Sequence, residues 1–189
     1  LIFSWKGKIK EKSKSYGRVS NIDFFPTIKK IIGHENKNLS LDGLDLNPVL
    51  RGEEMKKRSL FFHFPIYLEP YNVYKDNGTD PLFRTRPGSV IIKGNWKLHY
   101  YFEDNKLELY NIVKDISESI DLSKKNKEKT KELFDELKIW WKFNNAPIPS
   151  EKNPEYDQKF VDNLNFLIEN KKIRGRVNKN EKIEDKNPF

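Results

Sequence analysis

Residues 89–119 carry a regular alternation of apolar and polar positions, interrupted by two turn-forming pairs. The pairs are Gly94-Asn95 and Asp104-Asn105, residue types that tolerate the positive φ angles of tight hairpin turns. The apolar positions of the middle piece are Trp96, Leu98, Tyr100 and Phe102. A period of two residues is typical of a strand with one face on a core. The stretch therefore predicts a three-stranded antiparallel meander, with the intervening Lys97 and His99 on its solvent face.

Two further segments have the composition of strands. Leu60–Phe64 is apolar apart from His63, which predicts a strand between Arg58 and Pro65 that is covered on both faces. Leu1–Trp5 is predicted to be a short buried strand.

A long helix is predicted from Lys127 to about Phe143, with Asn126 as its N-cap. Its apolar residues fall on one stripe at helical spacing. They are Leu133, Leu137, Trp140 and Trp141. We expect this stripe to pack across the apolar face of the meander.

A shorter helix is predicted at Ile28–Ile32, ending at Gly33. Its start allows two arrangements. In one, Ser20 caps the helix and Asp23 reaches back to it, as in a capping box. In the other, Asp23 is the cap and Pro26 lies in the first turn, which strains the backbone less.

The remaining segments lack periodicity. Residues 34–57 are predicted to be a connector, and residues 66–88 a long loop of the kind that is more often functional than idle. A weak amphipathic helix is predicted at Phe160–Glu169, within a polar tail that has little to bury.

The formal net charge is +8, with charged residues at 34% of the chain. Lysine is spread through every segment, so we attribute the charge to a general richness in lysine, and predict no nucleic-acid partner. The chain has no cysteine, which excludes disulfides, thiolate metal sites and a cysteine nucleophile within it. No run approaches the roughly 20 apolar residues of a membrane span. The first residue is not methionine, so we expect a longer protein whose N-terminal part and any targeting segment precede Leu1.

Six stretches, in order, resemble the C-terminal part of the type I sulfatases, the arylsulfatase A-like branch of the alkaline phosphatase superfamily. They are residues 1–7 (LIFSWKG), 22–27 (IDFFPT), 41–46 (LDGLDL), 62–67 (FHFPIY), 87–115 and 153–157 (NPEYD). The sequence departs from the family pattern at Lys6, where proline is usual, and at Lys93, where arginine is frequent. The resemblance covers residues 1–157.

The resemblance implies an α/β fold for the whole parent protein. This chain would then hold the last strand and helix of the α/β catalytic domain, followed by an α+β subdomain with a small antiparallel sheet packed on a long helix. The implied limits are 1–33 for the end of the catalytic domain, 34–57 for the connector, 58–157 for the C-terminal subdomain and 158–189 for the polar tail.

The resemblance also implies a reaction, the hydrolysis of a sulfate ester. The implied substrate is a sulfated carbohydrate or an aryl sulfate. The family uses a formylglycine nucleophile and a calcium ion, so this chemistry is metal-assisted group transfer to a modified residue. The motif that is converted to formylglycine, Cys/Ser-x-Pro-x-Arg, is absent from this sequence. We therefore expect both groups to lie upstream of Leu1, in a missing N-terminal catalytic domain, and predict no catalytic residue, no metal ligand and no activity in this chain alone.

Four residues are predicted to face substrate. His63 matches the histidine of the family's His-x-Pro-x-Tyr strand, and Tyr67 matches its tyrosine; the alternative for His63 is a hydrogen-bonded core residue. Arg84 and Arg86 lie just before the meander, where guanidinium groups would bind sulfate or carboxylate oxygens in pairs. Their alternative is a role as solvated loop residues.

Two other functions stay open. One is a phosphodiesterase or phosphonate hydrolase of the same superfamily, which the upstream nucleophile would distinguish from a sulfatase. The other is a non-catalytic module that binds acidic polymers through the net positive charge. The composition indicates a bacterial source, and the family resemblance implies a location in the periplasm or outside the cell.

Overall fold

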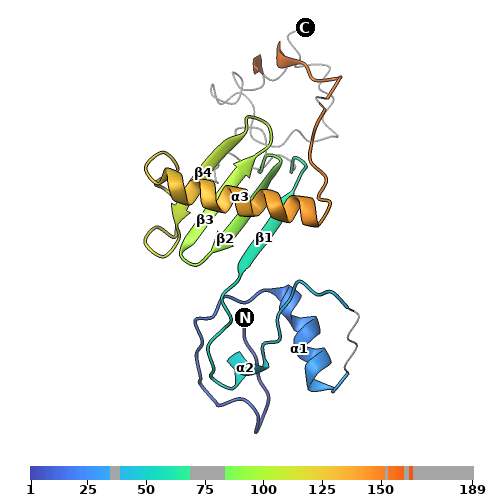
Figure 1. The fold of residues 1–189 in the computed structure, drawn as a ribbon, viewed down its shortest axis with the longest axis vertical. Coiled ribbons are helices and arrows are strands. Elements are labelled where there is room, and N and C mark those ends of the chain that lie inside the picture. Colours follow the sequence, from blue (N-terminus) through green and yellow to red (C-terminus); the bar gives the residue numbers. More distant parts are fainter. Residues whose placement is uncertain (35–38, 69–83, 152, 160–161, 164–189) are drawn as a thin grey trace. The chain divides into compact units, whose positions relative to one another are not determined.

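The computed structural model describes residues 1–34, 39–68, 84–151, 153–159 and 162–163, and the chain divides into two compact units. The first unit is Leu1–Lys57 and the second is Arg58–Phe189. Figure 1 shows the helices of the first unit and the sheet and long helix of the second. The domain limits inferred from the family resemblance stay predictions. In the part of the chain that the structure describes, no helix is long and apolar enough to cross a membrane.

The second unit contains a four-stranded antiparallel sheet in sequence order. Its strands are β1 (Ser59–Phe64), β2 (Gly88–Lys93), β3 (Trp96–Tyr101) and β4 (Lys106–Asn111). The turns between β2, β3 and β4 lie at the two predicted pairs, and Gly94 and Asn105 both have positive φ. The meander is therefore confirmed, and β1 joins it as the fourth strand.

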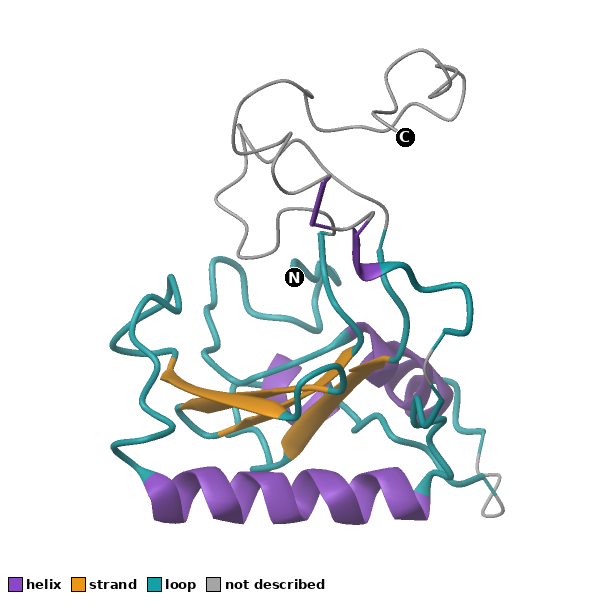
Figure 2. Ribbon diagram, turned by 90° about the horizontal axis from the view of Figure 1, so that it is seen from above, coloured by secondary structure: helices purple, strands orange, loops and turns teal. Residues whose placement is uncertain are grey.

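Helix α3 (Lys127–Phe143) crosses one face of this sheet, as Figure 2 shows. The core between the two layers consists of Ile91, Leu98, Tyr100, Leu109, Leu133 and Leu137, with Trp96, Phe102, Trp140 and Trp141 packed against it. Burial of these side chains is the main stabilising contribution, because each removes apolar surface from water. The predicted α+β arrangement of a small sheet on a long helix is thus confirmed. Asn126 holds the N-cap position, but its side chain makes no capping hydrogen bond.

The first unit is built around α1 (Phe24–Ile31), preceded by the 3₁₀ turn η1 (Asn21–Asp23) and followed by the short helix α2 (Asn47–Leu50). The Asp23 carboxylate accepts a hydrogen bond from Ser20 N at 2.7 Å, so the capping box is present at the start of η1. Asp23 also holds the N-cap position of α1, with Pro26 in the first turn, but its side chain makes no capping hydrogen bond to that helix. The same carboxylate accepts a hydrogen bond from Leu44 N at 2.9 Å, which explains why the charged Asp23 side chain can be buried. The helix ends at Ile31 with Ile32 as its C-cap, and the predicted stop residue Gly33 follows with a φ of +68°.

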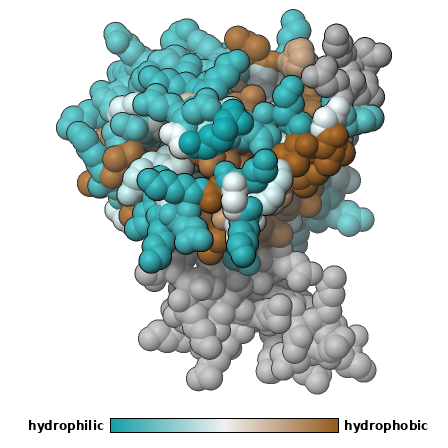
Figure 3. All heavy atoms as spheres, turned by 90° about the horizontal axis from the view of Figure 1, so that it is seen from below, coloured by the Kyte–Doolittle hydropathy of each residue, from teal (hydrophilic) through white to brown (hydrophobic). Residues whose placement is uncertain are grey.

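Helix α1 buries polar residues. Asp23 is 0% exposed and Thr27 is 3% exposed, whereas Phe25 and Ile28 are each 56% exposed. Thr27 Oγ1 donates to Asp23 O at 2.6 Å and accepts from Leu46 N at 2.9 Å. These hydrogen bonds hold α1 against residues 44–47 and leave its apolar side on the surface. Figure 3 shows brown apolar residues reaching the surface of the face that it draws.

Three expectations are wrong. Leu1–Trp5 forms no strand, because a strand needs a neighbour for its N–H and C=O groups and no described segment supplies one. The β1 strand is not covered on both faces, because Phe62 is 50% exposed. Lys97 and His99 were expected on the solvent face, but both are half-buried, because the Glu118 side chain contacts both of them. Most of the helix predicted at Phe160–Glu169, and most of the loop at 66–88, lie outside the described residues.

Candidate functional site

His63 lies on β1 on the side of the sheet that faces α3, directly opposite Ser89 on β2. Its Nδ1 is 2.6 Å from Ser89 Oγ, and its Nε2 is 2.9 Å from the carbonyl oxygen of Pro147. A carbonyl oxygen can only accept, so Nε2 carries a proton and donates to it. In the neutral ring, Nδ1 then accepts from the Ser89 hydroxyl.

Ser89 is the centre of a directional chain of hydrogen bonds. It is only 1% exposed, and its Oγ accepts from Trp141 Nε1 at 3.0 Å. The chain therefore runs from Trp141 to Ser89, then to His63, and ends at the Pro147 carbonyl. It ties β1, β2 and α3 to the segment after α3. Both ring nitrogens of His63 are occupied, which gives this residue a structural function; a substrate-facing role for it stays a prediction.

Tyr67 and Arg86 stand at the two ends of the long loop, and the loop is closed at its base by the hydrogen bond from Leu68 N to Thr85 O at 3.2 Å. Tyr67 Oη donates to Glu103 Oε1 at 3.0 Å. Arg86 Nη1 contacts the other oxygen of the same carboxylate at 3.0 Å. The two predicted residues thus converge on Glu103, in the turn between β3 and β4.

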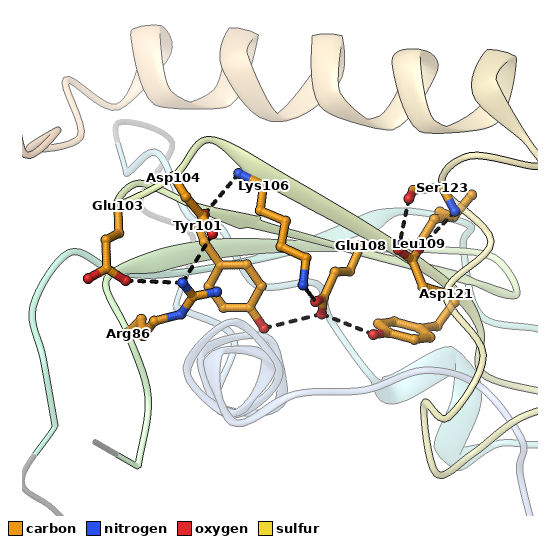
Figure 4. Close-up of polar contacts among 10 residues, drawn as sticks. Arg86, Tyr101, Glu103, Asp104, Lys106, Glu108, Leu109, Asp121 and Ser123 are labelled. Carbon is orange, nitrogen blue, oxygen red and sulfur yellow. Dashed lines mark hydrogen bonds and ion pairs between the residues drawn. The ribbon is translucent and has the colours of Figure 1, made fainter. Parts of the chain in front are cut away.

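The charge of Arg86 is balanced within the protein. Its Nη1 also lies 3.2 Å from Asp104 Oδ2, and its Cζ lies 4.5 Å from the centre of the Tyr101 ring (Figure 4). Burial by itself lowers the pKa of Arg86, but hydrogen bonds and charge attraction from Asp104 and Glu103 outweigh it and raise the pKa. An anionic ligand would have to compete with these two carboxylates for Arg86.

Arg84 differs from Arg86 in this respect. It is exposed, and it forms no ion pair with any residue that the structure describes. Its guanidinium has its planar set of donors available for oxygen atoms of a sulfate or carboxylate. Of the four predicted residues, Arg84 therefore has the geometry best suited to bind an anion.

A second polar cluster, which the sequence did not predict, lies on the side of the sheet away from α3. Glu108 Oε1 pairs with Lys106 Nζ at 2.7 Å, and its Oε2 accepts from Tyr110 Oη at 2.9 Å (Figure 4). Burial, and after it the negative charge of Glu108, raises the pKa of Tyr101 to about 12. The sequence signal for this cluster was the alternation along β4, whose polar position Glu108 lies opposite His99 on β3.

His99 and Lys97 share Glu118. Glu118 Oε2 is 2.7 Å from His99 Nε2, and Oε1 is 2.6 Å from Lys97 Nζ. Burial lowers the pKa of His99, the positive charge of Lys97 lowers it further, and Glu118 opposes both effects only in part. All of these groups have partners, so the cluster stabilises the sheet and offers no unsatisfied group for catalysis.

The described residues do not fit the calcium ion that a sulfatase uses, and the sequence does not fit its formylglycine. No group of three or more histidine, aspartate or glutamate side chains in the described ranges is arranged to hold a metal ion. The sequence has neither a cysteine nor a serine within a Ser-x-Pro-x-Arg motif from which a formylglycine is made. No catalytic step is therefore assigned to calcium or formylglycine here.

Comparison with known proteins identifies the family of this chain. Residues 1–144 match the family described as N-sulphoglucosamine sulphohydrolase, C-terminal. The chain belongs to this family. A relative described as a sulfatase, from Formosa agariphila, is 33% identical over 164 residues, which cover 78% of this chain and 27% of the relative. The chain thus corresponds to the C-terminal portion of a sulfatase and spans about a quarter of the length of this curated relative, which confirms the resemblance found in the sequence motifs.

A solved structure of a protein in complex with its substrate D-glucosamine-2-N,6-O-disulfate has a similar fold, with a TM-score of 0.50 and 23% identity, covering 68% of this chain and 25% of that protein. Another was solved with k-i-k-neocarrahexaose and has a TM-score of 0.49 and 21% identity, covering 82% of this chain and 29% of that protein.

Proposed function

We propose that this sulfatase C-terminal chain serves an enzyme that hydrolyses sulfate esters of carbohydrates. The observation that carries the proposal is the family match over residues 1–144, since the family is named for an enzyme that acts on a sulfated amino sugar. Hydrolysis transfers the sulfuryl group to water and leaves a sugar hydroxyl and inorganic sulfate. The calcium and formylglycine that the family resemblance implies would come from outside this chain, so we also propose that the chain alone is inactive.

The contribution of this chain is to the rim of the substrate site. Arg84 would bind the anionic sugar, because its charge is not balanced by any described residue. Tyr67 and Arg86 would hold the base of the loop in place through Glu103. His63 would hold the segment around Pro147 in position through its hydrogen bond to the Pro147 carbonyl oxygen.

The surface of α1 supports the proposal that residues 1–33 complete a larger catalytic domain. The helix directs Asp23 and Thr27 inward and leaves Phe25, Ile28 and Ile32 exposed. An apolar helix face of this kind is typical of a docking surface rather than of a free one. We expect this apolar face to pack against the catalytic domain of the same sulfatase. We also propose that the enzyme is located in the periplasm or outside the cell.

The test is the release of inorganic sulfate by the full-length gene product that carries this sequence. Sulfated glycans and N-sulfated glucosamine are supplied in one set of reactions, and 4-nitrophenyl sulfate in another. Faster release from the glycans supports a carbohydrate sulfatase. Release from the aryl ester alone would assign the enzyme to aryl sulfates, and binding of glycans without any hydrolysis would favour the non-catalytic module.

A further inference from the structure

A loop of five lysines in the first unit is the largest concentration of unbalanced charge in the described part of the chain. It is the segment 6–14, and its cations are Lys6, Lys8, Lys10, Lys12 and Lys14. All five are exposed, and none forms an ion pair with a described residue. The only acidic residue within the segment is Glu11. The sequence alone suggested that lysines are scattered, but the structure shows that these five differ from most lysines of the sheet and helix.

In the second unit, by contrast, lysines of the sheet and of α3 are commonly neutralised. Lys93 contacts Glu136 at 2.7 Å, and Lys97 contacts Glu118 at 2.6 Å. Lys131 lies 2.7 Å from Asp135. The absence of such partners along the lysine loop leaves its charge available to an external anion.

The backbone of the lysine loop is held in a defined shape. Lys8 N and Ile9 N both donate to Trp5 O at 3.0 Å, and Ile9 is half-buried. Further along, Ser13 Oγ donates to Lys10 O at 2.7 Å. These contacts fix the backbone and Ile9, so the lysine side chains project from an ordered loop. Ordering before binding reduces the entropy that a ligand must overcome.

The fold adds two lysines from another part of the first unit. Gly17 lies against Met55, where a Cβ on the glycine would come within 2.8 Å of Met55 Cβ. Lys56 and Lys57 follow Met55 directly and are exposed. Glu54 is the acidic residue next to them. The contact therefore brings two further lysines, about 40 positions away in the sequence, near the end of the lysine loop.

We infer that the lysine loop is a docking surface for a sulfated polysaccharide. A polysaccharide with sulfate groups along its length presents a row of anions, which several lysines can contact at once. Such binding releases counterions and therefore weakens as salt rises. This inference rests on the proposed function for the choice of polymer. It adds that the enzyme binds a polymer at the lysine loop as well as at the reacting sugar and so favours long substrates over short ones.

The experiment compares two variants of the full-length gene product that lose the same charge. The first changes the five loop lysines to serine (K6S, K8S, K10S, K12S, K14S). The control changes five exposed lysines of the second unit that also lack ion pairs with described residues. These are Lys114, Lys124, Lys125, Lys127 and Lys142. Binding of fluorescent heparin is measured by anisotropy at several salt concentrations, with double-stranded DNA of equal charge as the competing ligand.

We expect the loop variant to bind heparin about 10-fold or more weakly at low salt and to show a shallower salt dependence, because fewer counterions are released. The control should lose clearly less affinity. Equal losses in both variants would overturn the inference in favour of net charge, and tighter binding of DNA than of heparin would overturn it in favour of a nucleic-acid surface. Hydrolysis of a monosaccharide sulfate, measured in parallel, should be the same in the loop variant and the parent. If neither hydrolyses it, the proposed function fails while the binding result still decides the docking surface.

Discussion

Ser89 Oγ lies 2.6 Å from His63 Nδ1, and it also accepts a hydrogen bond from Trp141 at 3.0 Å. One buried hydroxyl therefore links two strands to the long helix. Replacing Ser89 with alanine leaves both partners without this hydrogen bond in a buried place. We expect S89A to lower the free energy of unfolding by about 1–3 kcal/mol.

This change is measured by urea unfolding followed by tryptophan fluorescence. The control is S117A, because Ser117 is an exposed serine of the same unit. The control should stay within about 0.5 kcal/mol of the parent. Equal stabilities for the parent and S89A would show that the hydrogen-bond chain contributes nothing.

Thr27 provides a similar test in the first unit. T27V keeps the shape of the side chain but removes the hydroxyl that accepts from Leu46 N and donates to Asp23 O. We expect a loss of about 1–2 kcal/mol in the free energy of unfolding. Circular dichroism during thermal unfolding measures it, with S4A as an exposed control in the same unit. If T27V unfolds at the same temperature as S4A, the buried hydroxyl does not anchor α1.

The elements of the second unit could be predicted because local signals and tertiary packing agree there. The turn pairs Gly94-Asn95 and Asp104-Asn105 set the hairpins, and the stripe from Leu133 to Trp141 set the helix. The strand expected at Leu1–Trp5 failed because a strand depends on a partner, which its own sequence does not reveal.

The candidate site was harder to predict for the same reason. The bond from His63 to the Pro147 carbonyl joins residues 84 positions apart. The sequence identifies Arg84 and Arg86 equally well, yet only the folded turn places Glu103 and Asp104 beside Arg86. Pairing across such distances depends on the whole fold rather than on local pattern.

His99 predicts how stability depends on pH. Burial, and after it Lys97, lowers the pKa of His99 below its ordinary value of 6.5. As pH falls through 6.5, the unfolded chain takes up a proton that the folded protein does not, so the free energy of unfolding decreases until the folded pKa is reached. H99Q should make the stability less dependent on pH in this window.

The measurement is urea unfolding at a series of pH values below neutrality. H34Q serves as the control, because His34 is exposed. Glu118 contributes at lower pH: burial raises its pKa, but hydrogen bonds from Lys97 and His99 outweigh burial and lower it, so its contribution is lost as pH falls below 4.5. Identical pH profiles for H99Q and the parent would contradict the assignment to His99.

Arg84 and Arg86 should differ when each is changed to alanine in the full-length gene product. R84A should raise KM for a sulfated glycan by about 10-fold, since a charge-assisted hydrogen bond to an anion is lost. R86A should instead lower stability by about 1 kcal/mol, because it removes partly exposed ion pairs with Glu103 and Asp104. Steady-state kinetics and thermal unfolding of both variants separate the two roles. Unchanged KM in R84A for each glycan tested would remove Arg84 from the site.

The central claim, that this chain is part of a carbohydrate sulfatase, is tested most directly by ion chromatography of the full-length gene product's reactions. Sulfated monosaccharides and polysaccharides are incubated beside a phosphodiester and a phosphonate ester under the same conditions. We expect inorganic sulfate from at least one sulfated carbohydrate and no hydrolysis of the phosphorus esters at a comparable rate. Hydrolysis of a phosphorus ester with no sulfate released from any sulfated carbohydrate would contradict it.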